Sequence, residues 1–177
     1  MKLMIASDIH GSMFYLEKLL TRFEAEKPDK LILLGDILYH GPRNDLPKGY
    51  DPKRVITLLN SIKDVIIAIN GNCDAEVDRM VLDFPILSDP QQITIDGKRT
   101  VLTHGHKYDF SDFGKLILHG HTHVLRAEKN DKDSIIVNPG SVSIPKDGNP
   151  NSFAILSNGI IKIFDFDMNV IKSINIK

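Results

Sequence analysis

The sequence predicts an α/β fold in which an alternating first half precedes a β-rich second half. Three short apolar runs, at residues 2–6, 30–34 and 65–69, are each followed by a polar cluster and then by apolar residues at helical spacing. This alternation is typical of a parallel sheet with crossover helices, whose ligands bind beyond the carboxyl ends of the strands. From residue 91 onward, short apolar runs joined by turn signals predict a second sheet. Helices are expected at residues 13–26, 53–62 and 75–82.

Composition limits the class of protein. The chain has 177 residues, of which 42% are hydrophobic and 25% charged, so we expect one globular domain over residues 1–177. The formal net charge is −1 and the basic residues are scattered, which argues against a nucleic-acid polymer as partner. Asp8 and His10 interrupt the N-terminal apolar run and the other runs are strand-sized, so we expect neither a signal peptide nor a membrane span. A single cysteine, Cys73, leaves no internal disulfide and fits the cytoplasm.

The first apolar run ends in the pattern Asp8-x-His10. In an extended backbone, side chains two residues apart point to the same side, so we expect both to reach one ion. Taken alone, this pattern is a frequent coincidence, and the nearby Ser12 suits the start of the helix expected at residues 13–26.

The second run ends in Gly35-Asp36, at a place where α/β sheets bind ligands, although a simple turn aspartate is the alternative. Residues 40–52 follow with three prolines, which predicts a stiff loop rather than regular structure. We expect this loop to form a rim in which Arg43 or His40 meets an anionic substrate. A surface connector or a contact between subunits is the alternative interpretation.

The third run ends in a polar cluster that contains Asn72, Cys73 and Asp74. Asn72 offers a neutral oxygen ligand for a metal ion. Asp74 either orients a neighbouring group or starts the helix expected at residues 75–82. The polar clusters that follow the three runs should therefore meet at one edge of the sheet.

Turn signals divide the second half into strands. Asp96-Gly97 and Ser157-Asn158-Gly159 are each typical of a β-hairpin. The expected strands cover residues 92–95, 98–103, 116–118, 124–128, 134–137, 153–156, 160–166 and 170–176. Alternating apolar and polar residues in the last of these predict an antiparallel or edge strand. Between residues 108 and 115 there is room for about two helical turns.

Five histidines follow strands of this second half, namely His104, His106, His119, His121 and His123. Imidazole is the commonest metal ligand, so the three that fall close together indicate a metal-binding turn. Gly120 lets the backbone of this turn approach an ion without a Cβ in the way. Any single histidine here has a simpler alternative as part of a polar loop, and His119 could cover the end of its strand.

Polar clusters thus stand at five strand ends, in the order Asp8-x-His10, Gly35-Asp36, Gly71-Asn72-Cys73-Asp74, His104 and Gly120-His121-Thr122-His123. Their order and spacing resemble those of the calcineurin-like metallophosphoesterases, whose motifs read D-x-H, G-D, G-N-H-D/E, H and G-H-x-H. The loop around Arg43 and residues 138–145 resemble the YfcE-type bacterial phosphodiesterases in particular. The resemblance implies a four-layer α/β/β/α sandwich of two facing mixed sheets with outer helices.

The resemblance also implies a metal site. A one-metal zinc site takes about three or four ligands, so seven candidates indicate two divalent ions. The implied ligands are Asp8, His10 and His123 for one ion, Asn72, His104 and His121 for the other, and Asp36 for both. Oxygen ligands mixed with imidazole favour Mn²⁺, with Zn²⁺, Fe²⁺ or Ni²⁺ as alternatives, over Ca²⁺. The remaining histidines, His40, His106 and His119, match no ligand position.

The implied activity is metal-dependent hydrolysis of a small phosphodiester. Two ions that share a water lower its pKa, and the resulting bridging hydroxide attacks phosphorus in line. Two divalent ions, two carboxylates and one hydroxide leave about one positive charge, which suits an anionic ester. The implied catalytic residues are Asp36, Asn72, Cys73 and Asp74, with Asn72 and Arg43 contacting substrate. Because Cys73 stands where many relatives carry a histidine that helps protonate the leaving group, we expect a preference for good leaving groups.

Rival interpretations stay open at this point. The same two-metal core hydrolyses monoesters in phosphomonoesterases and nucleotide phosphatases. The eukaryotic retromer subunit resembles this fold and serves as a protein-binding scaffold, but here all seven ligand positions carry side chains that can bind metal. A redox di-metal protein is a third alternative. Relatives suggest a homo-oligomer, a dimer or a tetramer.

Overall fold

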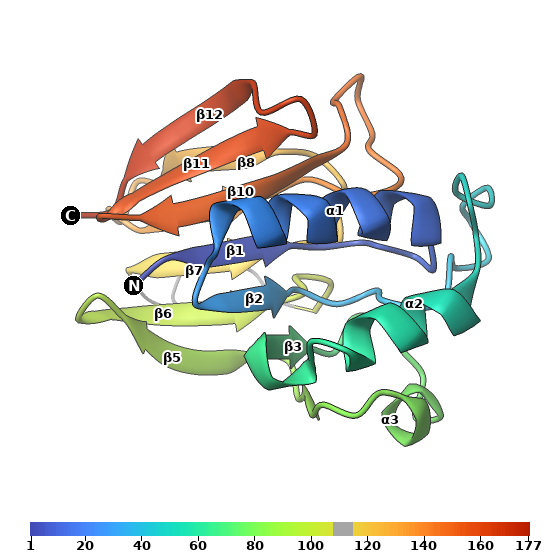
Figure 1. Cartoon of the computed structure of the whole chain (residues 1–177). Helices are drawn as coiled ribbons and strands as arrows, with labels where there is room; N and C mark the ends of the chain where they lie inside the picture. The colour runs from blue at the N-terminus through green and yellow to red at the C-terminus, as the bar shows by residue number, and fades with distance from the viewer. Residues whose placement is uncertain (108–114) are drawn as a thin grey trace.

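The computed structural model describes residues 1–107 and 115–177, which form two mixed β-sheets packed face to face (Figure 1). Within these residues the larger sheet contains, in spatial order, β12 (Val170–Asn175), β11 (Ile160–Asp165), β10 (Ser152–Ser157), β1 (Leu3–Ala6), β2 (Lys30–Leu33), β3 (Ile66–Ile69) and β4 (Ile86–Leu87). The smaller sheet contains β5 (Gln91–Ile95), β6 (Lys98–Thr103), β7 (Leu116–His119), β9 (Ile135–Asn138) and β8 (Arg126–Lys129). The two facing mixed sheets are therefore confirmed.

Two helices cover the outer face of the larger sheet, as Figure 1 shows. Helix α1 (Met13–Glu26) begins after Ser12, whose hydroxyl accepts a hydrogen bond from the N–H of Tyr15. Helix α2 (Pro52–Asn60) begins after Asp51, whose carboxylate accepts one from the N–H of Arg54. Both helices lie where their apolar spacing predicts them, and a 3₁₀ turn at Lys63–Val65 follows the second.

Helix α3 is much shorter than the helix expected at residues 75–82, because it covers only Asp78–Val81. The side chain of Asp74 is turned away from the helix and does not cap it, so that alternative is wrong. Asp78 instead accepts a hydrogen bond from the N–H of Ala75, which folds the preceding residues into turns.

Apolar side chains form two main layers. Leu16 and Leu19 of α1 and Val55 and Leu59 of α2 pack on the outer face of β1, β2 and β3. A second core lies between the sheets, where side chains such as Ile5 face residues of β6, β7 and β9. A small cluster of Val101, Ile117 and Ile136 lies on the other face of the smaller sheet. The two helical turns expected between residues 108 and 115 lie outside the described residues.

The last three strands do not extend the second sheet. Strand β10 pairs antiparallel with β1, placing Ala154 opposite Ile5, and β11 and β12 continue from it. The prediction that the whole second half forms a separate sheet is therefore wrong for residues 152–175. Local periodicity identifies a strand but not its partner. Here the hairpin of β10 and β11 pairs through β10 with the edge of β1 that β2 leaves open. Strand β12 is an antiparallel edge strand, as predicted.

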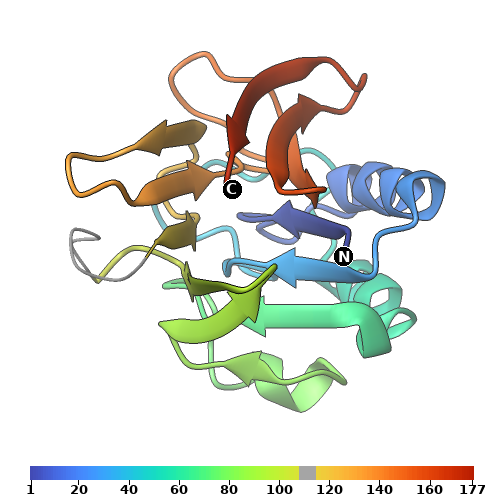
Figure 2. The same ribbon diagram turned by 90° about the vertical axis from the view of Figure 1, so that its left-hand side faces the viewer.

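The parallel strands of both sheets point to the same end of the molecule, opposite the two termini (Figure 1). Figure 2 looks at the end where both termini lie. The polar clusters after β1, β2, β3, β6 and β7 are thereby brought together at the far end. Within the described part of the chain, no helix has the length and hydrophobicity to cross a bilayer.

Candidate metal centre

Asp8 and His10 meet at this end, but not through an extended backbone. Both residues adopt left-handed conformations, with φ of 59° and 49°, so the prediction of an extended segment is wrong. The hydroxyls of Ser141 and Ser143 donate to the carbonyl of Asp8 at 2.9 and 3.1 Å and stabilise this bend. The two side chains still converge, with Asp8 Oδ1 3.6 Å from His10 Nε2.

The first group of converging side chains consists of Asp8, His10 and His123. His123 Nε2 lies 3.3 Å from Asp8 Oδ1 and 3.2 Å from His10 Nε2. All three side chains are buried. They can place one ligand atom each within 4.8 Å of one another, which matches the grouping expected for one ion.

Asp36 joins this group to a second one. Its Oδ2 lies 3.7 Å from His10 Nε2 and 3.4 Å from His104 Nε2. His104 Nε2 in turn lies 3.0 Å from the Oδ1 atom of Asn72. Asp36 therefore occupies a position between the two groups, as expected for a shared ligand.

His121 completes the second group less closely. Its ring lies 5.1 Å from that of His104, centroid to centroid, and its side chain is partly exposed. Its backbone N–H donates to Asp8 Oδ2 at 3.1 Å, which ties the turn to the first group. A Cβ at Gly120 would overlap the hydroxyl of Ser7, so close packing, rather than a positive φ, requires glycine here.

Backbone carbonyls orient three of the imidazoles. In each case the carbonyl accepts a hydrogen bond, so Nδ1 carries the proton and the Nε2 lone pair points toward the centre. The pairs and their distances are His10 with Tyr39 at 2.8 Å, His104 with Leu34 at 2.6 Å and His123 with Ile144 at 2.6 Å. This arrangement is typical of metal-binding histidines.

The donor set fits cations. In this tautomer, the lone pairs of His10 and His123 face each other at 3.2 Å, and the buried Asp8 Oδ1 has no hydrogen-bond partner among the described residues. Burial raises the pKa of Asp8, but the neighbouring side chains of His10 and His123 outweigh it and hold this pKa well below its usual range. Burial lowers the pKa of His104, yet the Asp36 carboxylate raises it to about 9, so the Nε2 atom of His104 binds a proton when no metal ion competes for its lone pair. The carboxylates thus favour positive charge at this centre, and a divalent ion supplies it.

Asp74 orients the second and third strand ends rather than starting a helix. Its carboxylate accepts hydrogen bonds from the N–H groups of Asp36, Ile37 and Gly71 at 2.8, 2.7 and 2.7 Å. Burial raises the pKa of Asp74, although these hydrogen bonds oppose the rise. This geometry supports the first of the two roles considered for Asp74.

Cys73 lies beside the shared carboxylate. Its backbone N–H donates to Asp36 Oδ1 at 2.8 Å, and its sulfur accepts from the side-chain amide of Asn72 at 3.2 Å. Burial, together with the charge of Asp36, raises the pKa of the Cys73 thiol to about 12. The thiol is therefore neutral near pH 7.

Several supporting residues were not identified from the sequence. Asn138 donates from its side-chain amide to the carbonyl of Gly120 at 2.8 Å and to Thr122 Oγ1 at 3.0 Å, which holds the histidine turn. Asp89, whose side chain is nearly inaccessible to solvent, accepts a hydrogen bond from the N–H of His104 at 3.1 Å. Residues 138–145 carry part of the family resemblance, but nothing in the sequence marks Asn138 as a support of the histidine turn, and no sequence signal marks Asp89.

A cavity of about 380 Å³ opens over the centre. Its lining residues include Asp36, Arg43, Asn72, Cys73, His121, His123 and Lys146. The rim predicted at residues 40–52 is therefore present through Arg43. His40 does not line the cavity, because its ring packs between those of Tyr39 and Tyr50. Lys146 was not singled out from the sequence, since a lone exposed lysine carries no pattern.

The two remaining unassigned histidines have different surroundings. The ring of His106 lies 5.5 Å from that of His104, and its Nδ1 is 3.7 Å from an oxygen of Asp89. His119 is buried, with its Nδ1 3.1 Å from the carbonyl oxygen of Gly120. Burial lowers the pKa of His119 to about 4, so its imidazole is neutral. Neither ring is part of the two converging groups.

Comparison with known proteins identifies the family. Residues 1–158 match the model of the calcineurin-like phosphoesterase superfamily domain. The phosphodiesterase YfcE of Escherichia coli K12 is 43% identical over 182 residues, covering 99% of this chain and 98% of that protein. A probable metallophosphoesterase of Bacillus subtilis, YsnB, is 24% identical over 169 residues, covering 89% of this chain and 84% of that protein.

Solved structures agree with the fold. The structure of YfcE, a phosphoesterase from E. coli, superposes with a TM-score of 0.95 at 43% identity and covers 100% of both chains. Vps29 of Entamoeba histolytica, crystallised with Zn²⁺, is 17% identical with a TM-score of 0.64 and covers 100% of both chains. At that identity the second likeness shows the fold alone.

Proposed function

The chain belongs to the calcineurin-like phosphoesterase superfamily, and from this membership we propose that it hydrolyses small phosphate diesters with two divalent metal ions. The observation that carries this proposal is the position of Asp36. Its Oδ2 lies within 3.7 Å of His10 Nε2 and 3.4 Å of His104 Nε2, on the floor of the cavity. A carboxylate shared by two ligand groups is what a two-metal hydrolase needs.

Seven side chains would hold the ions in this proposal, namely Asp8, His10, Asp36, Asn72, His104, His121 and His123. Mn²⁺ is the ion we propose first, with Zn²⁺, Fe²⁺ and Ni²⁺ as alternatives, because the set mixes oxygen with imidazole ligands. When bound, the ions supply an activated water and neutralise charge on the phosphoryl oxygens.

The residues of this chain fix the geometry of the reaction. The N–H of Cys73 holds Asp36 Oδ1 and leaves Oδ2 directed at both ligand groups. The Asn72 side chain faces His104 through its oxygen and lines the cavity, where we propose that it also contacts the phosphoryl group. Arg43 lines the same cavity, where we propose that it contacts the anionic substrate.

Hydrolysis of p-nitrophenyl esters tests the proposal. With Mn²⁺, we expect kcat/KM for bis-p-nitrophenyl phosphate to exceed that for p-nitrophenyl phosphate at least tenfold, and chelation to abolish both activities. A preference for the monoester would favour a phosphomonoesterase. Unchanged activity after complete removal of metal would contradict the two-metal proposal. Absence of any esterase activity in fully metal-loaded protein would favour a scaffold or a redox role.

The leaving group should matter strongly for this protein. Near Asn72 the cavity presents the neutral thiol of Cys73, which is a weak acid compared with an imidazolium. We expect kcat for a p-nitrophenyl diester to exceed that for a matched alkyl diester by about 100-fold or more, since acid catalysis contributes ~10²–10⁴-fold. Steady-state rates with the two esters measure this. Cys73→Ala should leave the ratio of the two rates unchanged, and equal rates for the two esters would contradict the prediction.

We further propose that the protein works in the cytoplasm as a homo-oligomer, a dimer or a tetramer. The lone Cys73 fits a reducing compartment. Light scattering coupled to gel filtration, which gives the mass in solution, tests the oligomeric part.

A further inference from the structure

Two cationic side chains line the cavity beside the proposed metal centre. Arg43 and Lys146 are both exposed, and neither forms an ion pair or side-chain hydrogen bond with another described residue. Most exposed cations need no explanation, but these two share one cavity with Asp36, Asn72 and the metal-binding histidines. Their positive charges are therefore available to whatever occupies that cavity.

Arg43 is held on the wall formed by Cys73. It lies in a tight turn in which the side-chain amide of Asn44 donates to the carbonyl of His40 at 2.8 Å. A Cβ at Gly41, which has φ of 80°, would lie 2.9 Å from the sulfur of Cys73. The turn is thus packed closely on Cys73, and Pro42 stiffens it.

Lys146 is held on a different wall, formed by His123. Its N–H donates to the carbonyl of His123 at 3.2 Å. Its own carbonyl accepts hydrogen bonds from the backbone N–H of Asn149 at 3.0 Å and from the side-chain amide of that residue at 2.7 Å. The backbone of Lys146 is therefore anchored while its ammonium group stays unpaired. Because the backbone is already fixed, only the side chain of Lys146 loses conformational entropy when a ligand binds.

The charge balance indicates what these two residues bind. Two divalent ions with two carboxylates and one hydroxide carry about one positive charge, which one phosphodiester anion neutralises. Arg43 and Lys146 then add two positive charges that the described acidic residues do not pair. On the basis of the proposed function, we infer that the physiological substrate carries a second anionic group, a carboxylate or a phosphate, on an ester arm. Arg43 and Lys146 bind that group and so select the substrate.

A matched series of synthetic diesters tests this inference. All members keep p-nitrophenol as leaving group, and the other arm is a propyl chain that ends in a hydroxyl, a carboxylate, a phosphate or an ammonium group. With Mn²⁺, we expect kcat/KM to be about tenfold higher for the carboxylate or phosphate arm than for the hydroxyl arm, mainly through a lower KM. This ratio corresponds to ~1.4 kcal/mol from the two charge-assisted contacts together. The ammonium arm should be the poorest. The ratio between the two anionic arms distinguishes carboxylate from phosphate.

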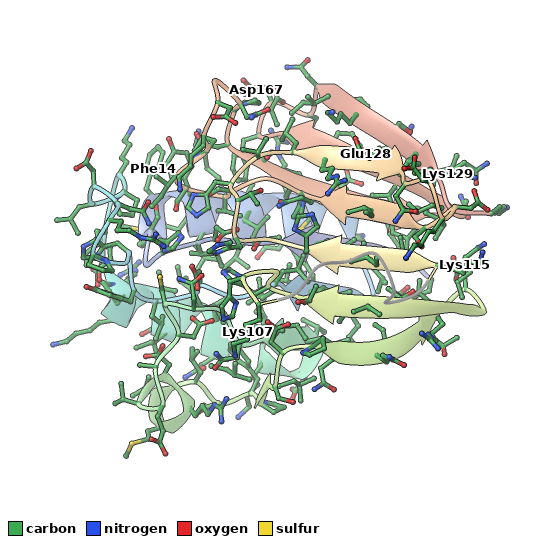
Figure 3. The ribbon with its side chains drawn as sticks, turned by 180° about the vertical axis from the view of Figure 1, so that it is seen from behind. Phe14, Lys107, Lys115, Glu128, Lys129 and Asp167 are labelled. Carbon is green, nitrogen blue, oxygen red and sulfur yellow. The ribbon has the colours of Figure 1, made fainter. Side chains whose placement is uncertain are left out.

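Substitutions assign the preference to residues. Arg43→Gln and Lys146→Gln should each reduce the preference for the anionic arm about threefold to fivefold. Lys115→Gln is the matched control, because Lys115 is exposed at the end of the molecule away from the cavity (Figure 3) and should leave every rate unchanged. Titration calorimetry with a non-hydrolysed methylphosphonate ester that carries the carboxylate arm gives a second readout, in which both cavity variants should weaken binding relative to its hydroxyl counterpart.

The outcomes separate this inference from the proposed function. Hydrolysis of all four diesters at equal efficiency, with no change of ratio in either variant, would overturn the inference and leave the phosphodiesterase proposal intact. Equal losses on all arms in both variants would also overturn it, because the cations would then contact the scissile phosphate. Failure to hydrolyse any arm with full metal occupancy would instead refute the proposed function.

Discussion

Replacing Asp36 with asparagine is expected to lower kcat/KM for bis-p-nitrophenyl phosphate at least 1,000-fold, which is ~4 kcal/mol of transition-state stabilisation. Asp36 Oδ2 is the atom that lies close to both ligand groups, at 3.7 Å from His10 Nε2 and 3.4 Å from His104 Nε2. Asparagine can keep the hydrogen bond that Oδ1 accepts from the N–H of Cys73. It places a neutral amide where the shared carboxylate oxygen stood, so at least one ion should be lost.

Metal analysis and kinetics together measure this effect. Asp36→Asn should contain fewer than two ions per chain by elemental analysis and keep the circular-dichroism spectrum of the parent. Asp133→Asn is the control, because Asp133 is exposed and pairs with Lys129 at 3.2 Å, and the activity of this variant should change less than twofold. Activity of Asp36→Asn within tenfold of the parent would refute the shared-ligand role.

The histidine turn supplies the second large effect. His121→Gln and His123→Gln should each lower kcat/KM about 100-fold or more, since even the partners that orient metal ligands contribute ~10–100-fold. His123 Nε2 lies 3.3 Å from Asp8 Oδ1, and His121 lines the cavity beside His104. His119→Gln should change kcat/KM less than threefold, because His119 is buried beneath the turn and faces the carbonyl of Gly120.

The three histidine variants must be compared while each is fully folded. His119→Gln removes a buried ring and should lower Tm, so rates are taken well below the transition and metal content is determined for each variant. Equal losses of activity and metal in all three variants would contradict the division of the turn into two ligands and one supporting residue. Full metal content in His123→Gln would remove His123 from the ligand set.

Much of the fold could be predicted because its signals are local. The apolar spacing of residues 13–26 matches α1 residue for residue, and the Asp96-Gly97 signal matches the hairpin of β5 and β6. The two residues of that turn have φ of 47° and 78°, which is the conformation that such sequences favour. Strand β4, with two residues, is too short to give any periodic signal.

The proposed metal ligands could also be predicted from the sequence, for a related reason. Asp36, Asn72 and His104 each follow an apolar run. Chain direction places Asp36 and Asn72 at one edge of the larger sheet, and His104 follows β6 of the smaller sheet that faces it. Their side-chain chemistry is also written directly in the sequence. No local pattern predicts the left-handed backbone conformation of Asp8 and His10. That of Asp8 depends on hydrogen bonds from residues more than 130 positions away in the sequence.

By itself, the sequence determined the α/β class, most of the helices and strands, and the side chains that we propose as ligands of two metal ions. Only the tertiary structure decided that β10 pairs with β1, that Asp74 and the serines after β9 support the centre, and that Arg43 shares its cavity with Lys146. The physical reason is that periodicity and turn chemistry act between near neighbours in the chain. Strand partners, buried hydrogen bonds and cavity walls are set by packing between segments that are distant in sequence, and that packing has no local signature.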